Sequence, residues 1–485
     1  MNNAFYKLGL IICLGAGSYF GITHFIVDQS DGNDLDEISY AIYSDFPDGS
    51  VERISSIDSY TVVSLIHRQL LDIDDHGNII GDLATKWDVS ADKLNFRFHL
   101  DKSVQFEDGD HLTCKTVVDG LLPRFKVLNL YQKTISKIKS LDCDARGRVN
   151  LTLTTRSFNL LRFLSSKQAA IYKTAPNGSL LTLGPYKVDP NNNRLIKRLV
   201  QSEGPLSIKF LRYFDVAEAV EAHRRKQVDL VNLKGHNLPT KNVSYLSTPL
   251  YGRGWRLSAG RNRPDHQSII KEVHASLDRK SIIDRTLAPH GKFMPAYGVI
   301  PPHLQGHTRK ISQNYPENPT DEILRILVIK SYQSHPIVVE TVRELQRLGY
   351  SVNLVGVELK DLYKKLLNGD YQFALYSVSL SDNIEDAFIR YLDWYVKPNQ
   401  DKQALSIYKK MSDLSDKIDS SPSKFTRQSL LVAMEEIVNS EPFYVPIVFE
   451  KIEFLARKCI SIRHGNSFLS YRIDFRKVTK NRVCP

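Results

Sequence analysis

Short stretches of the chain alternate between apolar and polar residues, which is the pattern of half-buried β-strands. The clearest examples are residues 94–100, 149–154 and 206–214. We expect 149–154 to lie at the edge of its sheet. Other stretches, such as 55–71 and 337–348, carry apolar residues every three or four positions, which predicts helices with one buried face. The chain is therefore expected to mix strands and helices.

The order of these elements predicts two successive α/β regions. In the first, a strand at 206–214 precedes a helix at 216–225 and a second strand at 227–231, an order that gives parallel strands. A strand at 251–260 should lead from the first region to the second. The second region should contain strands at 324–329, 352–357 and 371–376 and helices at 337–348, 362–367, 404–417 and 425–440.

Length and charge narrow the class of protein. A chain of 485 residues is long enough for two or three domains. The formal net charge of +11 would suit a nucleic-acid partner, but the densest basic runs, at 224–226 and 476–482, are not interleaved with aromatic residues. No helix-turn-helix pattern precedes residue 36. We therefore expect a solvated basic surface and no nucleic-acid partner.

An apolar segment near the N-terminus predicts export. Residues 8–27 are almost all apolar and are followed by the acidic stretch 28–37. The segment is longer than the roughly 7–15 apolar residues of a signal peptide and close to the ~20 of a spanning helix. Ile12 precedes Cys13, where a lipoprotein signal has a small residue. We expect a periplasmic or cell-envelope protein, anchored to the inner membrane by residues 8–27 if they are not cleaved.

The motifs that usually carry catalysis or metal binding are missing from the sequence. It has no G-x-S-x-G, H-E-x-x-H or C-x-x-C. His303 and His307 have helical spacing, but two prolines before them predict a loop rather than a metal site. The segment 72–77 starts like a calcium loop, yet His76 and Leu83 stand where oxygen ligands are required. We expect a protein that is not an enzyme and that holds no metal or cofactor.

The five cysteines leave the disulfide pattern open. In an exported protein, Cys114 could pair with Cys143, and Cys459 with Cys484. The sequence alone does not choose among the pairings.

Residues 81–120 carry the pattern most typical of one family. An Ala-x-x-Trp-x-x-Ser-x-Asp segment is followed by an aromatic strand and then by a Val-x-Phe-x-Asp-Gly-x-x-x-Thr turn. The residues concerned are Ala84, Trp87, Ser90, Asp92, Val104, Phe106, Asp108, Gly109 and Thr113. Further matches are the Gly-Pro-Tyr-x-Val run at 184–188 and the Asp-Arg pair at 278–279. In this order, over residues 36–475, the chain resembles the bacterial extracellular solute-binding proteins of family 5, the peptide- and nickel-binding class.

The resemblance implies an α/β fold of the two-lobed periplasmic-binding-protein type (type II), with an extra small subdomain in lobe one. Residues 1–35 would be a signal peptide or signal anchor. Lobe one would comprise residues 36–258 and 441–485, with the subdomain inserted at about 72–180. Lobe two would comprise residues 259–440.

The same resemblance implies the receptor of an ABC importer, which closes by a hinge on an oligopeptide or a similar small solute held between its lobes. Permease subunits would be its partners, and a monomer is expected. The family's ligand positions fall on Trp255 and Ser258 of the crossing strand and on Tyr376, Ser379 and Asp382 further along. Trp255 and Tyr376 would serve equally well as packed residues with no ligand contact.

Two departures from the family pattern leave a second function open. Residues 259–261 lack the Asn that usually follows the aromatic pair, and Ser379 stands where peptide binders carry an Asp for the ligand's ammonium group. A buried ammonium needs a charged partner. Either Asp382 supplies it, or the ligand has no free amine there. The alternative function is a membrane-anchored sensor or interaction protein on the same fold, with an altered ligand site.

Overall fold

The computed structural model describes most of the chain between residues 37 and 481. Residues 1–36 and 482–485 lie outside the described part, as do several internal stretches. The longest of these stretches are 198–203, 237–243, 301–322, 380–401 and 463–472.

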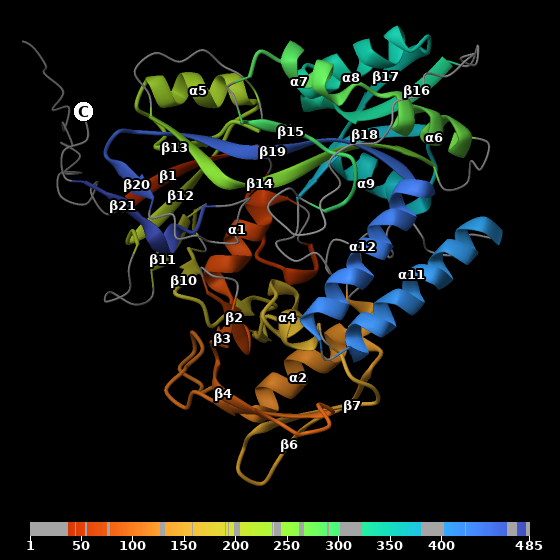
Figure 1. The fold of residues 1–485 in the computed structure, drawn as a ribbon. Coiled ribbons are helices and arrows are strands. Elements are labelled where there is room, and N and C mark those ends of the chain that lie inside the picture. The colour runs from red at the N-terminus through yellow and green to blue at the C-terminus, as the bar shows by residue number, and fades with distance from the viewer. Residues whose placement is uncertain are drawn as a thin grey trace, which may run out of the picture. The chain divides into compact units, whose positions relative to one another are not determined.

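Strands from both predicted α/β regions join in one mixed sheet (Figure 1). Among the described residues this sheet has eleven strands, in the order β10-β11-β12-β1-β13-β19-β14-β18-β16-β17, with β15 pairing beside β19. β1 is parallel to β12 and β13, and β16 is parallel to β17 and β18, as the predicted α/β order requires. The bounds are β1 Glu37–Ile42, β10 Tyr186–Val188, β11 Arg194–Lys197, β12 Ser207–Arg212, β13 Leu230–Asn232, β14 Ser244–Ala259, β15 Phe293–Pro295, β16 Ile323–Ile329, β17 Ser351–Val357, β18 Phe373–Ser379 and β19 Tyr444–Ala456.

Helices cover both faces of the part of the sheet that contains β1, called the β1 half below. Helix α1 (Ile57–Ile66) packs on one face and α5 (Val216–Arg224) on the other (Figure 1). A capping box starts α1, because the amides of Ser56 and Ser59 each donate to the other residue's hydroxyl. β13 and the last residues of β1 are therefore buried on both sides, whereas β12 keeps exposed residues and an alternating sequence.

The part that contains β16, called the β16 half, is covered in the same way. Helices α6, α7 and α8 pack on one face and α9 on the other. Pro336 occupies the first turn of α8, where its missing N–H is no loss. Gly369 follows α9 with a φ of 69°, the left-handed conformation that glycine adopts without strain. The bounds are α6 Gln267–Ser276, α7 Arg279–Arg285, α8 Pro336–Arg347 and α9 Leu359–Asn368.

Two further helices, α11 (Lys402–Ser420) and α12 (Lys424–Ser440), pack against each other around a small apolar core of their own. They confirm the helices predicted at 404–417 and 425–440. The ammonium of Lys137 donates to Asp419 of α11 at 2.5 Å. Only 12% and 5% of these two side chains are exposed. This ion pair joins α11 to the region around residue 137, which belongs to a separate small sheet.

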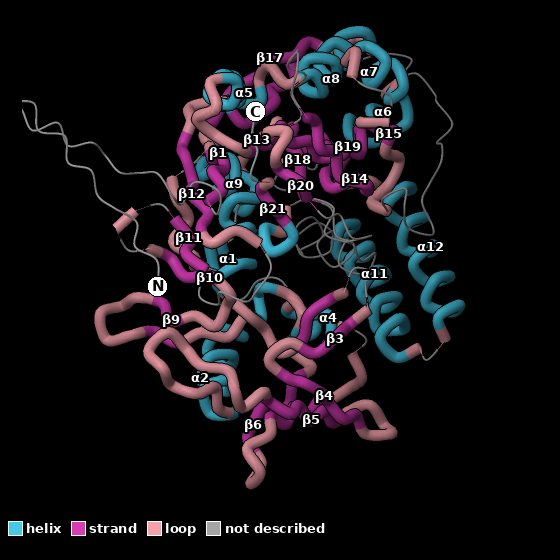
Figure 2. The backbone as a smooth tube through the Cα atoms, turned by 90° about the vertical axis from the view of Figure 1, so that its left-hand side faces the viewer, coloured by secondary structure: helices cyan, strands magenta, loops and turns pink. Residues whose placement is uncertain are grey.

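That small sheet and its apolar core lie between residues 70 and 183 and are separate from the main sheet (Figure 2). Its strand order is β4-β5-β7-β6, so the prediction that 149–154 is an edge strand is wrong. β7 pairs with β5 on one side and with β6 on the other. The strand alternates because one face of the sheet is solvated, and an internal antiparallel strand shares that pattern with an edge strand. The bounds are β4 Ala84–Val89, β5 Asn95–Leu100, β6 Ile138–Cys143 and β7 Val149–Leu153.

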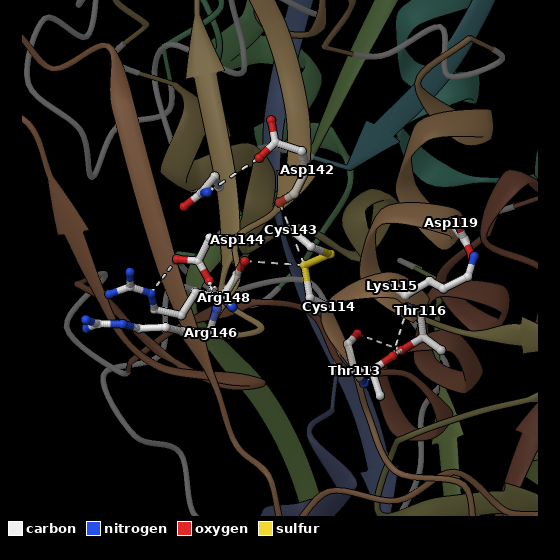
Figure 3. Close-up of a disulfide and its surroundings, with 11 residues drawn as sticks. Thr113, Cys114, Lys115, Thr116, Asp119, Asp142, Cys143, Asp144, Arg146 and Arg148 are labelled. Carbon is white, nitrogen blue, oxygen red and sulfur yellow. Dashed lines mark hydrogen bonds and ion pairs between the residues drawn. A yellow bond between two sulfur atoms is a disulfide. The ribbon is translucent and has the colours of Figure 1, made fainter.

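A disulfide joins this small sheet to the helix beside it (Figure 3). Cys114 is the first residue of α2 (Cys114–Phe125), and its sulfur is bonded to that of Cys143 at the end of β6. The structure thus shows one of the pairings that the sequence left open. Cys459 is disulfide-bonded as well. Cys484, a possible partner from the sequence, lies outside the described residues.

The predicted export segment, residues 1–35, lies outside the described part of the chain, so its role stays a prediction. None of the helices that the structure describes is long and apolar enough to cross a membrane. The predicted lobe boundaries at residues 258 and 440 fall at the end of β14 and just before β19. They also stay predictions.

Candidate functional site

Two long antiparallel strands, β14 and β19, connect the β1 half to the β16 half. The first residues of β14, from Ser244 to Ser247, pair with the part of β19 that also pairs with β13. The last residues, from Arg253 to Ala259, pair with β19 on one side and β18 on the other. The predicted crossing strand at 251–260 is therefore confirmed, and β19 is a second one. We call the middle of these two strands the crossing.

The parallel strands of both halves end at the crossing. Just beyond β13, the amide of Leu233 donates to the carbonyl of Glu453 on β19. From the other side, β18 ends where the backbone of Ser379 pairs with that of Arg253. Ligands of open α/β sheets bind outside the carboxyl ends of the parallel strands. The residues just beyond β1, β13 and β16 are therefore candidate ligand residues.

Four ring side chains from both halves meet here and form what we call the ring cluster. Trp255 of β14 has its ring centroid 4.4 Å from that of His335 and 5.4 Å from that of Tyr332. His236, which follows β13, lies 5.5 Å from His335, which precedes α8. Burial lowers the pKa of both histidines, so that both imidazoles are neutral at pH 7. The cluster links the two halves by direct contact.

A buried carboxylate orients the tryptophan of the ring cluster. Glu450 of β19 has no exposed surface and accepts hydrogen bonds from Nε1 of Trp255 at 2.7 Å and from Nη1 of Arg253 at 3.3 Å. Nearby on the same strand, Glu453 pairs with the buried ammonium of Lys292, with 2.8 Å between N and O. Each of these two carboxylates, one fully and one partly buried, therefore has a buried cation beside it, as burial of charge requires.

Lys234 and Tyr43 add a polar group from the β1 half. Nζ of Lys234 lies 4.2 Å from the centroid of the Tyr43 ring, which is a cation–π contact. The Tyr43 hydroxyl donates to the carbonyl of Asn232 at 2.6 Å. Tyr43 directly follows β1 and Lys234 follows β13, so both stand at the carboxyl end of a parallel strand. Both side chains are half-buried.

The predicted ligand residues lie on both faces of the crossing strands. Arg256 is directly opposite Tyr376 of β18, so Trp255, one residue earlier, points to the other face. Trp255 packs in the apolar core under α8, whereas Tyr376 packs in the core under α9. Ser258 is fully buried, with its hydroxyl 3.0 Å from that of Tyr371. The structure therefore does not bring Trp255 and Tyr376 to a common surface.

The other two predicted ligand residues are Ser379, at the end of β18, and Asp382, which follows it in the sequence. Ser379 ends this strand, and its backbone lies beside Arg253 at the crossing. Asp382, like His303 and His307, lies outside the described residues. The predicted ligand loop thus starts at the same crossing as the ring cluster. All five predicted ligand residues stay predictions.

Sequence reasoning missed the polar and aromatic residues that follow the parallel strands. The signal that could have found them is the rule that ligands bind at the carboxyl ends of such strands, applied to the strands predicted at 227–231 and 324–329. The missed residues are Tyr43, Lys234, His236, Tyr332 and His335.

Metal binding finds no support in the described part of the chain. No group of three or more His, Cys, Asp or Glu side chains is placed there to hold an ion. In the segment that starts like a calcium loop, Asp74 accepts hydrogen bonds from the backbone and side chain of Asn78. These bonds are typical of a solvated turn.

The sequence matches one known protein family. Residues 78–396 match the family model described as bacterial extracellular solute-binding proteins, family 5, middle. No curated protein matches the chain.

Solved structures share the fold at low sequence identity. The periplasmic binding protein AgaA from A. tumefaciens R10, in complex with agropinic acid, has a TM-score of 0.75 at 18% identity, covering 92% of this chain and 99% of that one. NikA from Brucella suis, in complex with Fe(III)-EDTA, has a TM-score of 0.74 at 13% identity, and the match covers 92% of this chain and 100% of NikA. DppA from Helicobacter pylori, in complex with the peptide STSA, has a TM-score of 0.74 at 15% identity, and the match covers 92% of this chain and 98% of DppA. These likenesses confirm the predicted two-lobed α/β fold.

Proposed function

Because the chain belongs to the bacterial extracellular solute-binding proteins of family 5, we propose that it is the extracytoplasmic receptor of an ABC importer. It binds an oligopeptide or a similar small solute between its lobes and delivers it to the permease subunits. It acts by binding and not by catalysis, in keeping with a family of solute receptors.

One observation carries this proposal: the parallel strands of both halves end at one crossing, where side chains of the two halves touch. His236 and His335 make this contact, with 5.5 Å between ring centroids. A solute held at the carboxyl ends of both strand sets would contact both halves at once. Such a solute favours the closed arrangement because it gains contacts there that the open arrangement lacks.

The crossing strands have the features of a hinge. The pairing between β14 and β19 shifts in register between Ser247 and Tyr251, and again between Tyr251 and Arg253. Such irregularities interrupt the ladder of hydrogen bonds and let the strands bend locally. We place the hinge at these residues, where the strands pass from one half to the other.

The solved relatives support a small solute but not one chemical class. Agropinic acid, a metal chelate and a tetrapeptide are bound by proteins of this fold. We propose His236, Tyr332 and His335 as contacts, beside Trp255 of the crossing and the loop 379–382. Ser258 and Tyr376 would contact the solute only if it extends to the α9 face.

Native mass spectrometry of the full chain tests the function. The protein is purified without denaturation and compared with a sample that has been unfolded and refolded. A small mass that is present before refolding and lost afterwards supports a receptor and identifies the ligand class. Added back at a hundredfold excess over Kd, that ligand should stabilise the fold by about 2.7 kcal/mol. An empty protein that no peptide or solute library stabilises would contradict the proposal.

A pair of histidine variants tests the site. His236→Ala should weaken binding of the recovered ligand, since this half-buried ring stands at the contact between the halves. His111→Ala is the matched control, because His111 is an exposed histidine of the small sheet region. Equal affinities of the two variants would place the ligand elsewhere.

A further inference from the structure

Lys234 is held in one conformation at the crossing. Its backbone has a φ of 46°, in the left-handed region that residues other than glycine rarely adopt. The turn is stabilised because the Lys234 amide donates to Oδ1 of Asn232 at 2.9 Å. The ammonium lies over the ring of Tyr43, whose hydroxyl is bonded to the Asn232 carbonyl. Strained residues that the surroundings hold in place are frequent at binding sites.

The ammonium of Lys234 has no carboxylate within 4.0 Å among the described residues. The other two cations near the ring cluster, Arg253 and Lys292, are paired with Glu450 and Glu453. The crossing thus has a half-buried positive charge that its paired neighbours do not neutralise.

Two other acids face this region, and neither forms an ion pair with Lys234 within 4.0 Å. Asp58 is buried, and desolvation raises the pKa of its carboxyl, while the charge of Lys234 opposes that rise. Asp215 caps helix α5, where its side chain accepts the amide hydrogen of Glu218. A charge of this kind, partly removed from water, is stabilised when a ligand supplies the opposite charge.

A neutral hydrogen-bond donor faces the same place from the β16 half. Nδ1 of His335 accepts from the amide of Ile337 at 3.2 Å, so the proton of the neutral ring is on Nε2. This N–H is fully buried and has no partner within 3.5 Å in the described part of the chain. Burial lowers the pKa of this ring most, and a hydrogen-bond interaction with the backbone of Lys234 acts in the opposite direction. An acceptor oxygen placed beside Lys234 would therefore meet donors from both halves.

We propose that Lys234 binds an anionic oxygen group, so that the solute of this receptor is a carboxylic acid that presents its carboxylate to the β1 half. The inference rests on the proposed function and specifies its ligand. It also gives an account of Ser379, which stands where peptide binders carry an Asp: the charged contact at this site is a cation of the protein, and the ligand needs no free amine.

Matched solute pools test the inference on the full chain. One pool contains N-acetyl amino acids and N-acetyl dipeptides with free carboxylates. The second contains the same N-acetylated compounds as uncharged carboxamides. The third contains these carboxamides without the acetyl group, so that each has a free amine and no carboxylate. We expect thermal stabilisation by the first pool only, and an affinity for its best member that falls as salt is added.

Three lysine variants assign the effect to one side chain. Lys234→Met should weaken binding of the best acid by about tenfold or more, the loss expected for a hydrogen bond to a charged group. Lys234→Arg keeps the charge and should retain most of the affinity. Lys226→Met is the control, since Lys226 is an exposed lysine that also has a positive φ, of 63°. Circular dichroism of each ligand-free variant checks that it folds.

The outcomes separate this inference from the proposed function. Binding of the amine or carboxamide pool as tightly as the acids, unchanged in Lys234→Met, would overturn the inference and leave a receptor of another ligand class. Binding of no pool, with no co-purified ligand, would overturn both. Loss of acid binding in Lys234→Met, with Lys226→Met unchanged, would support both.

Discussion

Glu450 is the residue whose substitution tests the structure of the crossing most directly. Its carboxylate is fully buried and accepts from Trp255 and Arg253. Arg253 is itself only 5% exposed. Burial alone would lower the pKa of this guanidinium, but the carboxylate of Glu450 holds it above its ordinary value. The two charges therefore depend on each other.

Glu450→Gln removes the charge and keeps the shape. The amide oxygen can still accept from Trp255, but Arg253 is left as a buried charge without a counter-ion. Removing one partner of a buried ion pair destabilises a protein by about 3–5 kcal/mol. We expect about 3 kcal/mol here, at the lower end, because the second hydrogen bond survives. In the double variant Arg253→Met/Glu450→Gln no charge remains, so the loss should be smaller than in Glu450→Gln alone, by about 1.5 kcal/mol or more.

Urea unfolding followed by far-UV circular dichroism measures these differences, and an unchanged slope with urea shows that the variants expose the same surface on unfolding. Asp284→Asn is the control. Asp284 pairs with Lys280 on the exposed side of α7, and such a pair contributes only about 0–1 kcal/mol. The reasoning would be refuted if Glu450→Gln were as stable as this control, or if the double variant were less stable than Glu450→Gln.

Three further predictions concern the small sheet region and its contacts. In a double-mutant cycle with Lys137→Met and Asp419→Asn, we expect a coupling of about 0.5–3 kcal/mol in the free energy of unfolding, because this ion pair is mostly buried. Replacing Cys114 and Cys143 by Ala should lower that free energy by about 3–4 kcal/mol, since the disulfide closes a loop with a sequence separation of 29. Burial lowers the pKa of His67 from its ordinary 6.5 to about 4. Below pH 6.5 the unfolded chain therefore binds a proton that the folded chain does not, and stability should fall by up to about 1.4 kcal/mol per pH unit down to pH 4. His67→Gln should lose that part of the pH dependence, measured by urea unfolding at pH 7 and pH 5.

Each of these predictions has an outcome that contradicts it. Additive effects of Lys137→Met and Asp419→Asn would mean that the pair contributes no coupling. Equal stability of the oxidised and the cysteine-free proteins would show that the disulfide stabilises the folded state no more than the unfolded one. If wild type and His67→Gln lose stability in parallel between pH 7 and pH 5, the imidazole is not held neutral by burial.

Much of the local structure follows from the sequence because its causes are local. The alternation at 94–100 and 206–214 gives β5 and β12, and the periodic apolar residues at 337–348 give α8. The same pattern at 149–154 identified a strand but misplaced it at an edge. Whether a strand has hydrogen-bonded neighbours on one side or on both depends on segments far away in the chain. Alternation shows only which face of the strand is solvated.

The candidate site could be predicted less well than the fold. Trp255 was found because it lies in the crossing strand, yet its carboxylate partner, Glu450, is almost two hundred residues later. Tyr376 was expected to share a surface with Trp255, but the register between β14 and β18 sends their side chains to opposite faces. A shift of one residue in that register would reverse the result, and the sequence contains no local signal for it.

The sequence by itself determined the family, the α/β composition and the strand that crosses between the lobes, because motif order and hydrophobic period are properties of neighbouring residues. Only the tertiary structure decided which side chains meet at that crossing. His236 and His335 touch, and Lys234 has no carboxylate within 4.0 Å among the described residues, because strands from two distant parts of the chain end at the same place in one sheet. Long-range pairing sets these contacts, and it is not written in any single stretch of sequence.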